Sequence, residues 1–206
     1  EKIGTRIEHF MIDEFQDTSN LQWENFRPLF NESLDKGKAC LIVGDVKQSI
    51  YRWRNSDWRL LGSGLKRYFD DSKRVDRVLD TNYRSCRQIV AFNNAFFSTA
   101  AQLLQDKFNA MLEASTCSED KEHLSTRIAD AYGDVMQQVP PMHRSCEGHV
   151  QVSFIDAPSV DAFKNEALDR IPGLLVRLQQ NGYRLRDIAF LVRNKADGVL
   201  IADALL

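Results

Sequence analysis

Two adjacent carboxylates, Asp13 and Glu14, directly follow the apolar residues Phe10, Met11 and Ile12. A short apolar run is typical of a buried strand, so both acids are expected where that strand leaves its sheet. An aspartate at a strand end is suited to hold Mg²⁺, and a neighbouring glutamate can take a proton from an attacking water. Taken alone, the dipeptide is explained as well by two solvated acids in a loop.

A second polar loop follows the next apolar run, ACLIVG at 39–44. It contains Asp45 and Gln48, which are expected beyond the carboxyl end of the strand, where open α/β sheets bind ligands. The sequence then alternates aromatic and basic residues in YRWRNSDW, residues 51–58. Between residues 45 and 59, four basic and two acidic side chains give a local formal charge of +2.

Aromatic rings interleaved with cations make a stacking platform for single-stranded bases, and each stacked base contributes roughly 1–3 kcal/mol. Tyr51, Trp53 and Arg54 are the candidates for such a platform. Packing in the core is the alternative for the tryptophans, and it is favoured for Trp58.

A third group, LDTNYRS at 79–85, comes after another expected strand. Tyr83 offers a flat ring and Arg84 a guanidinium fork, a pair that can stack on a base and hold a phosphate. In isolation, a Tyr-Arg pair at a strand end is more often packing and surface charge.

The elements that position these groups follow from the hydrophobic pattern. Residues 7–13 and 39–44 are expected to be neighbouring strands of a parallel sheet. Between them a helix is predicted, with Ser19 or Asn20 as its cap and Gly37 at its end. The further expected elements are a helix over 57–69 weakened by glycines, a strand at 74–80, a helix capped by Ser85 over 85–104, a partly helical insertion at about 105–148, a strand at 149–156, a helix to about 180 kinked or split at Pro172-Gly173, a strand at 187–193 and a final helix.

The composition limits the class of protein. A chain of 206 residues with 43% apolar content suits one large or two small globular domains. A net charge of −2 excludes a uniformly basic nucleic-acid binder, so any nucleic-acid contact is local. No apolar run reaches the roughly 20 residues of a membrane span, which favours a cytoplasmic protein without membrane partners. The four cysteines are scattered, and reduced thiols are expected.

The order and spacing of DEFQDTS, VGDVKQSIYRWR and LDTNYRS resemble motifs II, III and IV of superfamily-1 DNA helicases of the UvrD, Rep, RecB and AddA type. Within that group the chain resembles the AddA/RecB helicase–nuclease subunits most. The resemblance implies an α/β fold of RecA-like parallel sheets flanked by helices. Residues 1–70 would be the C-terminal part of domain 1A, and residues 71–206 the N-terminal part of domain 2A.

The same resemblance implies a role for each matching residue. Asp13 would coordinate Mg²⁺ and Glu14 would activate the hydrolytic water. Gln48 would sense the γ-phosphate of ATP, Tyr83 would stack on adenine, and Arg84 would reach the γ-phosphate from the second domain. The residues that would contact single-stranded DNA are Tyr51, Trp53 and Arg54.

The chain departs from the family in several places. It contains no GxxxxGK[ST] phosphate loop, no later helicase motifs and no nuclease, and Asn55-Ser56 stand where the family often has glycine. The expectation is an internal fragment of an ATP-dependent translocase for single-stranded DNA or DNA ends, acting in repair or recombination. A possible partner is a second helicase–nuclease subunit. Two alternatives remain open: a non-catalytic DNA- or protein-binding module, and a metal nuclease built on Asp13, Glu14, Asp17 and Asp45.

Overall fold

The computed structural model describes residues 7–114 and 121–206. The chain forms two compact units, residues 1–150 and residues 151–206, and each is described by itself. Within the described residues no helix is long and apolar enough to cross a membrane. The boundary expected at residue 70 between two RecA-like domains stays a prediction.

The first unit begins with a small parallel sheet. Strand β1 (Met11–Ile12) pairs with β2 (Leu41–Ile42), and Met11 lies opposite Leu41. Beyond the ends of the strands, the Val43 amide donates to the Ile12 carbonyl at 2.8 Å and the Phe15 amide donates to the Val43 carbonyl at 3.0 Å. The parallel pairing predicted for residues 7–13 and 39–44 is confirmed, although each strand is shorter than expected.

Helix α1 (Asn20–Asp35) connects the two strands and has the predicted ends. Ser19 caps it in a capping box: the Ser19 hydroxyl accepts from the Gln22 amide, and the Gln22 side chain accepts from the Ser19 amide. After the helix, Gly37 takes a left-handed φ of 69°, a conformation that glycine adopts without steric cost.

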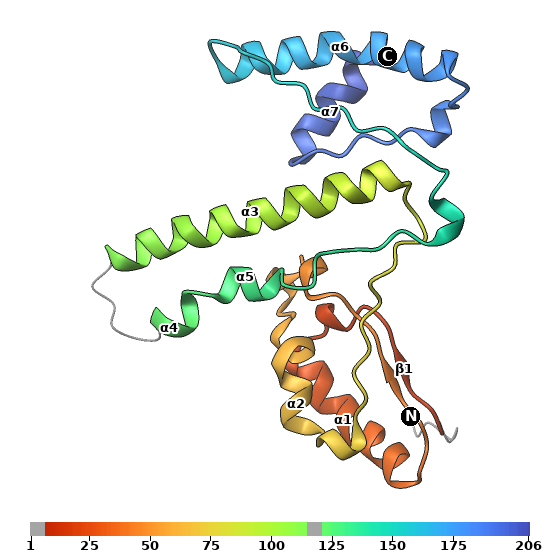
Figure 1. Ribbon diagram of the computed structural model, residues 1–206, viewed down its shortest axis with the longest axis vertical. Helices are drawn as coiled ribbons and strands as arrows, with labels where there is room; N and C mark the ends of the chain where they lie inside the picture. Colours follow the sequence, from red (N-terminus) through yellow and green to blue (C-terminus); the bar gives the residue numbers. More distant parts are fainter. Residues whose placement is uncertain (1–6, 115–120) are drawn as a thin grey trace. The chain divides into compact units, whose positions relative to one another are not determined.

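The core of this region is aromatic. Phe15 and Trp23 are completely buried, and their rings meet edge to face with centroids 5.2 Å apart. Phe30, Leu60 and Phe69 complete the buried cluster. Figure 1 shows α1 and α2 (Leu65–Tyr68) on the same side of the strand pair. Instead of one helix weakened by its glycines, residues 60–68 form a π-helical turn (Leu60–Gly64) followed by α2.

The rest of the first unit is helical. Helix α3 (Arg87–Glu113) is longer than predicted and begins after Cys86, so the expected cap at Ser85 is wrong by one residue. The predicted insertion is partly helical, with α4 (Lys121–Leu124) and α5 (Arg127–Ala131). The buried Gln105 joins α3 to this segment, because its Oε1 accepts from the Ile128 amide at 2.7 Å.

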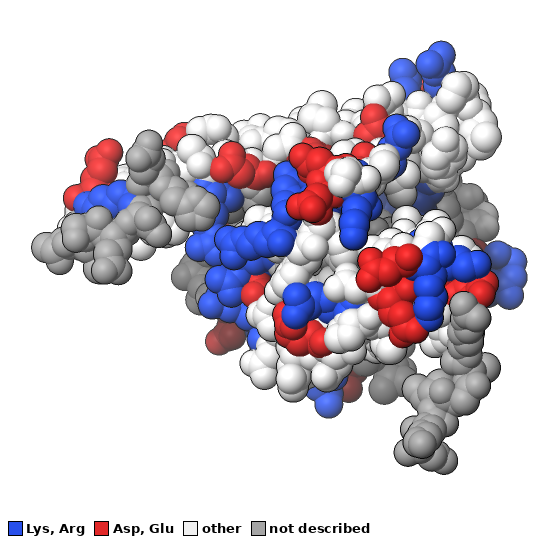
Figure 2. Space-filling view, turned by 90° about the horizontal axis from the view of Figure 1, so that it is seen from below, with Lys and Arg blue, Asp and Glu red and all other residues white. Residues whose placement is uncertain are grey.

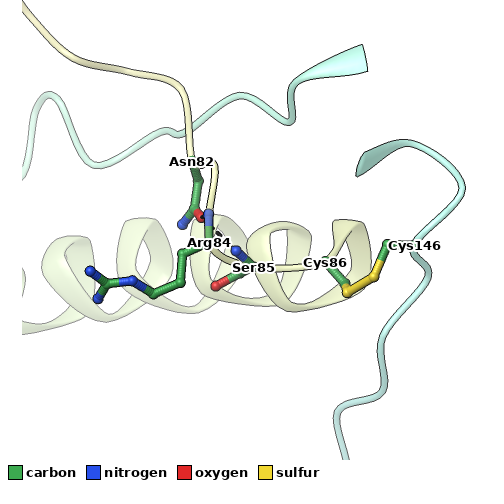
Figure 3. The surroundings of a disulfide bond; sticks show 5 residues. All are labelled: Asn82, Arg84, Ser85, Cys86 and Cys146. Carbon is green, nitrogen blue, oxygen red and sulfur yellow. Dashed lines mark hydrogen bonds between the residues drawn. A yellow bond between two sulfur atoms is a disulfide. The ribbon is translucent and has the colours of Figure 1, made fainter. Parts of the chain in front are cut away.

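The expectation of reduced thiols is corrected for one pair of cysteines. Cys86 and Cys146 form a disulfide, with their Cα atoms 5.1 Å apart (Figure 3). The sequence separation of 60 residues hides this proximity. The fold produces it by pairing two backbone segments: the Arg87 amide donates to the Cys146 carbonyl at 3.0 Å, and the Gln88 amide donates to the Glu147 carbonyl at 2.8 Å.

The second unit contains α6 (Val160–Gln180) and α7 (Lys195–Ala204). Ser159 caps α6, and Pro172 lies inside this helix, so the predicted split at Pro172-Gly173 is wrong. The strands predicted at 74–80, 149–156 and 187–193 are also wrong, since these residues are not paired into strands. A strand needs a neighbour for its backbone hydrogen bonds, and within the described residues these three segments join no sheet. The architecture is therefore mixed helical, with one small parallel sheet in the described part of the chain.

Candidate functional site

The turn after β1 places both candidate carboxylates at the surface. Glu14 adopts φ 53° and ψ 38°, a left-handed conformation uncommon outside glycine, and its amide donates to Asp13 Oδ1 at 2.9 Å. Gln16 Nε2 donates to Glu14 Oε2 at 2.6 Å. Within the described residues, Asp13 Oδ2 and Glu14 Oε1 accept no protein hydrogen bond. Each acid therefore keeps one oxygen for a ligand.

Gln16 is the residue that the sequence analysis missed. Its side chain is only 1% exposed, and its Oε1 accepts from the Asp45 amide at 3.0 Å while its Nε2 holds Glu14. Gly44 permits this approach, because a Cβ on that residue would lie 2.6 Å from Gln16 Oε1. Gln16 thus links the two strand-end loops. A polar residue directly after the buried Phe15 was the available indication in the sequence.

The second loop is organised by Asp45. Its Oδ1 accepts from the Lys47 amide at 3.0 Å and from Lys47 Nζ at 2.9 Å, and its Oδ2 accepts from Gln48 Nε2 at 3.1 Å. Burial alone would raise the pKa of Asp45, but the hydrogen bonds from Lys47 and Gln48 outweigh it and lower that pKa below the ordinary value. Asp45 is therefore an ionised support that orients Gln48.

Lys47 is the cation that joins this loop to a distant part of the unit. Its ammonium lies 2.8 Å from a carboxylate oxygen of Asp134, in addition to its contact with Asp45. Burial would lower the pKa of Lys47, but the hydrogen bonds to Asp134 and Asp45 raise it above the ordinary value. The ammonium stays charged and has two acidic partners.

The aromatic residues after this loop lie close together and exposed. Trp53 is 71% exposed, and its ring meets Tyr51 with centroids 6.2 Å apart. The Arg54 guanidinium carbon lies 4.4 Å from the Trp53 ring centroid and 5.3 Å from that of Tyr51. This is a ready cation–π cluster with free ring surface. Trp58 differs, since it is partly buried and Arg127 covers its ring at 5.5 Å.

The third group forms a turn before α3. Asn82 Oδ1 accepts from the amides of Arg84 and Ser85, at 2.9 and 2.8 Å, and so fixes the backbone (Figure 3). The Tyr83 ring is 66% exposed, and Figure 3 shows the Arg84 side chain extending away from the disulfide. Within the described residues, no hydrogen bond joins the side chain of Tyr83 or Arg84 to Asp13 or Glu14.

The structure therefore connects two of the three groups directly. Gln16 brings Asp13 and Glu14 together with the loop of Asp45 and Gln48, whereas Tyr83 and Arg84 form a separate group on their own turn. The residues named for a metal nuclease do not gather: in the described part of the chain, no three His, Cys, Asp or Glu side chains could hold a metal ion together. Both oxygens of Asp45 are already bonded to Lys47 and Gln48.

Charge is mixed over the surface. On the face drawn in Figure 2, Lys and Arg side chains alternate with Asp and Glu side chains, and neither sign covers it continuously. This agrees with the net charge of −2. A contact with nucleic acid would depend on a local feature such as the Tyr51–Arg54 cluster rather than on the general field.

Comparison with known proteins identifies relatives for both the first third and the whole of the chain. Residues 1–69 match the UvrD/REP helicase N-terminal domain family. The chain is 40% identical over 101 residues to RecBCD enzyme subunit RecB of Chlamydia trachomatis, a match covering 49% of this chain and 10% of that protein. It is 27% identical over 208 residues to the exonuclease/helicase subunit RexA of Lactococcus lactis, which covers 100% of this chain and 16% of that protein.

RecB of Haemophilus influenzae also matches along the whole chain, with 27% identity over 210 residues and 16% of that protein covered. The chain thus spans between 10% and 16% of the length of these three relatives. The matches confirm the resemblance that the three motifs indicated, and the chain belongs with the UvrD-like superfamily-1 helicases, near the RecB and AddA-type helicase–nuclease subunits.

Proposed function

We propose that this chain is part of an ATP-driven helicase subunit that moves along single-stranded DNA and acts in DNA repair or recombination. The observation that carries the proposal is the Gln16 link, which holds Glu14 and the Asp45–Gln48 loop at one edge of the sheet. One relative is named as an exonuclease/helicase subunit, which supports the same class of activity here. On this proposal residues 1–70 and 71–206 belong to two RecA-like domains.

The exposed acids suit a magnesium nucleotide. Mg²⁺ prefers carboxylate oxygens and keeps several of its waters, and Asp13 presents an oxygen without a hydrogen bond to the described residues at a strand end. Bound Mg²⁺ would supply positive charge to the phosphates. Glu14 would accept the proton of the attacking water at its Oε1, while Gln16 holds the other carboxylate oxygen in place.

Gln48 would report whether a γ-phosphate is present. Its Nε2 donates to Asp45 Oδ2, so the amide can exchange this partner for a phosphate oxygen. The proposal places Tyr83 on the adenine ring and Arg84 on the γ-phosphate. Because their turn has no hydrogen bond to Asp13 or Glu14 in the described residues, closing the two domains on ATP would bring them together. An arginine in this role contributes roughly 10³–10⁵ in rate.

The cluster of Tyr51, Trp53 and Arg54 would bind the DNA. Its rings offer stacking faces, and its guanidinium can reach a backbone phosphate. The cluster begins three residues after Gln48, so movement of that amide on ATP hydrolysis can reach the stacked bases through a short stretch of backbone. The partners that fit this activity are DNA ends and a second helicase–nuclease subunit.

The test is ATP turnover by the longest protein that contains this chain, with and without a single-stranded oligonucleotide, beside the variant Glu14→Gln. We expect DNA-stimulated hydrolysis in the wild type, reduced by about 10²-fold or more in the variant because the proton acceptor is lost. Asp35→Asn removes an exposed acid at the far end of α1 and serves as the matched control. Full turnover in Glu14→Gln would contradict the proposed role.

Without a GxxxxGK[ST] loop, the 206-residue chain alone should hydrolyse ATP negligibly. Robust Glu14-dependent turnover by that chain would contradict this. The missing loop also favours the second candidate, a DNA- or protein-binding module without catalysis. DNA binding with no turnover, in a protein whose biological activity is indifferent to Glu14→Gln, would support that module.

A further inference from the structure

Residues 134–138 form a short segment, here called the strap, that contacts both of the separate site groups. At its start, Asp134 accepts from Lys47 Nζ at 2.8 Å, on the Asp45–Gln48 loop. At its end, Gln137 and Gln138 bond to the turn that carries Tyr83 and Arg84. Three residues of extended chain span at most roughly 11 Å, so the strap joins the two groups over a short reach.

Gln138 holds the backbone before the turn. Its amide donates to the Asp80 carbonyl at 2.7 Å, and its carbonyl accepts from the Asn82 amide at 2.8 Å. Its Nε2 also donates to the Asp80 carboxylate at 2.6 Å. The pattern is a parallel bridge between Thr81 and Gln138, so strap and turn are paired as in a sheet.

Gln137 carries the contact onward to Arg84. Its backbone is held on both sides by the side-chain amide of Asn94 in α3: Asn94 Nδ2 donates to the Gln137 carbonyl at 2.9 Å, and the Gln137 amide donates to Asn94 Oδ1 at 3.0 Å. From that fixed position, Gln137 Oε1 accepts from Asn82 Nδ2 at 2.7 Å. The other atom of the same amide, Asn82 Oδ1, holds the amides of Arg84 and Ser85.

We propose that the strap is a positioning element: Gln137 orients the Asn82 side chain, and Asn82 in turn orients the backbone of Tyr83 and Arg84 relative to the Asp45–Gln48 loop. The disulfide between Cys86 and Cys146 holds the far end of the same chain segment against the start of α3 (Figure 3). Gln137 touches neither nucleotide nor metal in this proposal. Its effect on catalysis rests on the proposed function, whereas its hold on the turn does not.

The experiment compares Gln137→Leu with Gln137→Glu in the longest protein that contains this chain. Leucine keeps the bulk but removes the acceptor for Asn82 Nδ2, and glutamate keeps an acceptor. Gln102→Leu is the matched control, since Gln102 is an exposed glutamine of α3 whose side chain donates to Asp106 on the same helix. The measurements are amide hydrogen exchange at Arg84 and Ser85, and kcat and KM for ATP with single-stranded DNA.

We expect Gln137→Leu to accelerate exchange at both amides and to lower kcat by about three- to tenfold, the usual value of one hydrogen bond, with KM for ATP little changed. Gln137→Glu should restore both, and Gln102→Leu should change neither. Unchanged exchange in Gln137→Leu would overturn the proposal, as would equal losses in the leucine and glutamate variants. If the wild type hydrolyses no ATP, the proposed function fails, and the exchange data alone decide whether the strap holds the turn.

Discussion

Residues 7–69 and residues 151–206 use their apolar side chains in opposite ways. In the first region Phe15 and Trp23 are 0% exposed and pack within one aromatic cluster. In the second region no residue is buried, and Phe154 and Leu191 are 91% and 99% exposed. The difference lies in the neighbours: the first region brings two strands and two helices together, whereas the apolar segments of the second lie unpaired. Apolar sequence becomes a core only where partners cover it.

The sharpest test of this contrast is truncation of one large aromatic side chain in each region. Trp23→Ala should lower the free energy of unfolding by about 3–5 kcal/mol, because it opens a cavity in the middle of the cluster. Phe154→Ala should change it by no more than about 0.5 kcal/mol, since that ring is already in solvent. Urea unfolding followed by circular dichroism measures both. Comparable losses would show that Phe154 is covered in solution.

In the stretch of sequence between these regions, a covalent bond does what packing does in the first. Cys146→Ser should lower the free energy of unfolding of the first unit by about 2–4 kcal/mol, because the disulfide closes a loop with a sequence separation of 60 residues. Cys40→Ser is the control, because Cys40 is a free cysteine. Urea unfolding with and without a dithiol reductant measures the effect. A wild type that is indifferent to the reductant would contradict it.

The parts of the fold that were predictable are those determined by neighbouring residues. Helix α1 was predicted with both ends because Ser19 and Gly37 act locally, and β1 and β2 because one helix connects them. The strands predicted at 149–156 and 187–193 have the right composition, but pairing depends on a partner that composition cannot show. The disulfide was missed for a similar reason, since it depends on contacts between distant segments.

The candidate site divides in the same way. Residue types and spacing named Asp13, Glu14 and Gln48, and the structure lays them beyond the ends of paired strands, while their roles stay predictions. Gln16 was missed because its importance lies in being buried between two loops. The strap was missed because residues 134–138 contain no chemistry of their own and act only through the turn that they pair with.

A smaller effect should separate the regions by its sign. Gly44→Ala should destabilise the first region by about 1–3 kcal/mol, because the added Cβ would lie 2.6 Å from Gln16 Oε1 and 2.8 Å from Leu61 Cδ2. Gly173→Ala should stabilise the second by about 0.5–1 kcal/mol, because it lies inside α6 with nothing within 4 Å. Thermal unfolding compares the two variants. A gain in stability for Gly44→Ala would show that the loops are not closely packed at Gln16.

The smallest expected difference concerns one carboxylate in each region. Asp57 accepts hydrogen bonds from Arg59 and from Asn20 Nδ2, and the Arg59 bonds, opposed by burial, lower its pKa from 3.8 to about 2. Because the folded value lies below the ordinary one, the ionised form stabilises the fold above about pH 4, and that contribution disappears as the pH falls toward 2. Asp187 also has a lowered pKa, through hydrogen bonds from Arg184, but it is fully exposed. The urea midpoints of the wild type and Asp57→Asn should therefore converge between pH 4 and 2, while Asp187→Asn should differ little from the wild type throughout. A constant gap for Asp57→Asn over this range would mean that the contact of Asp57 with the start of α1 does not depend on its charge.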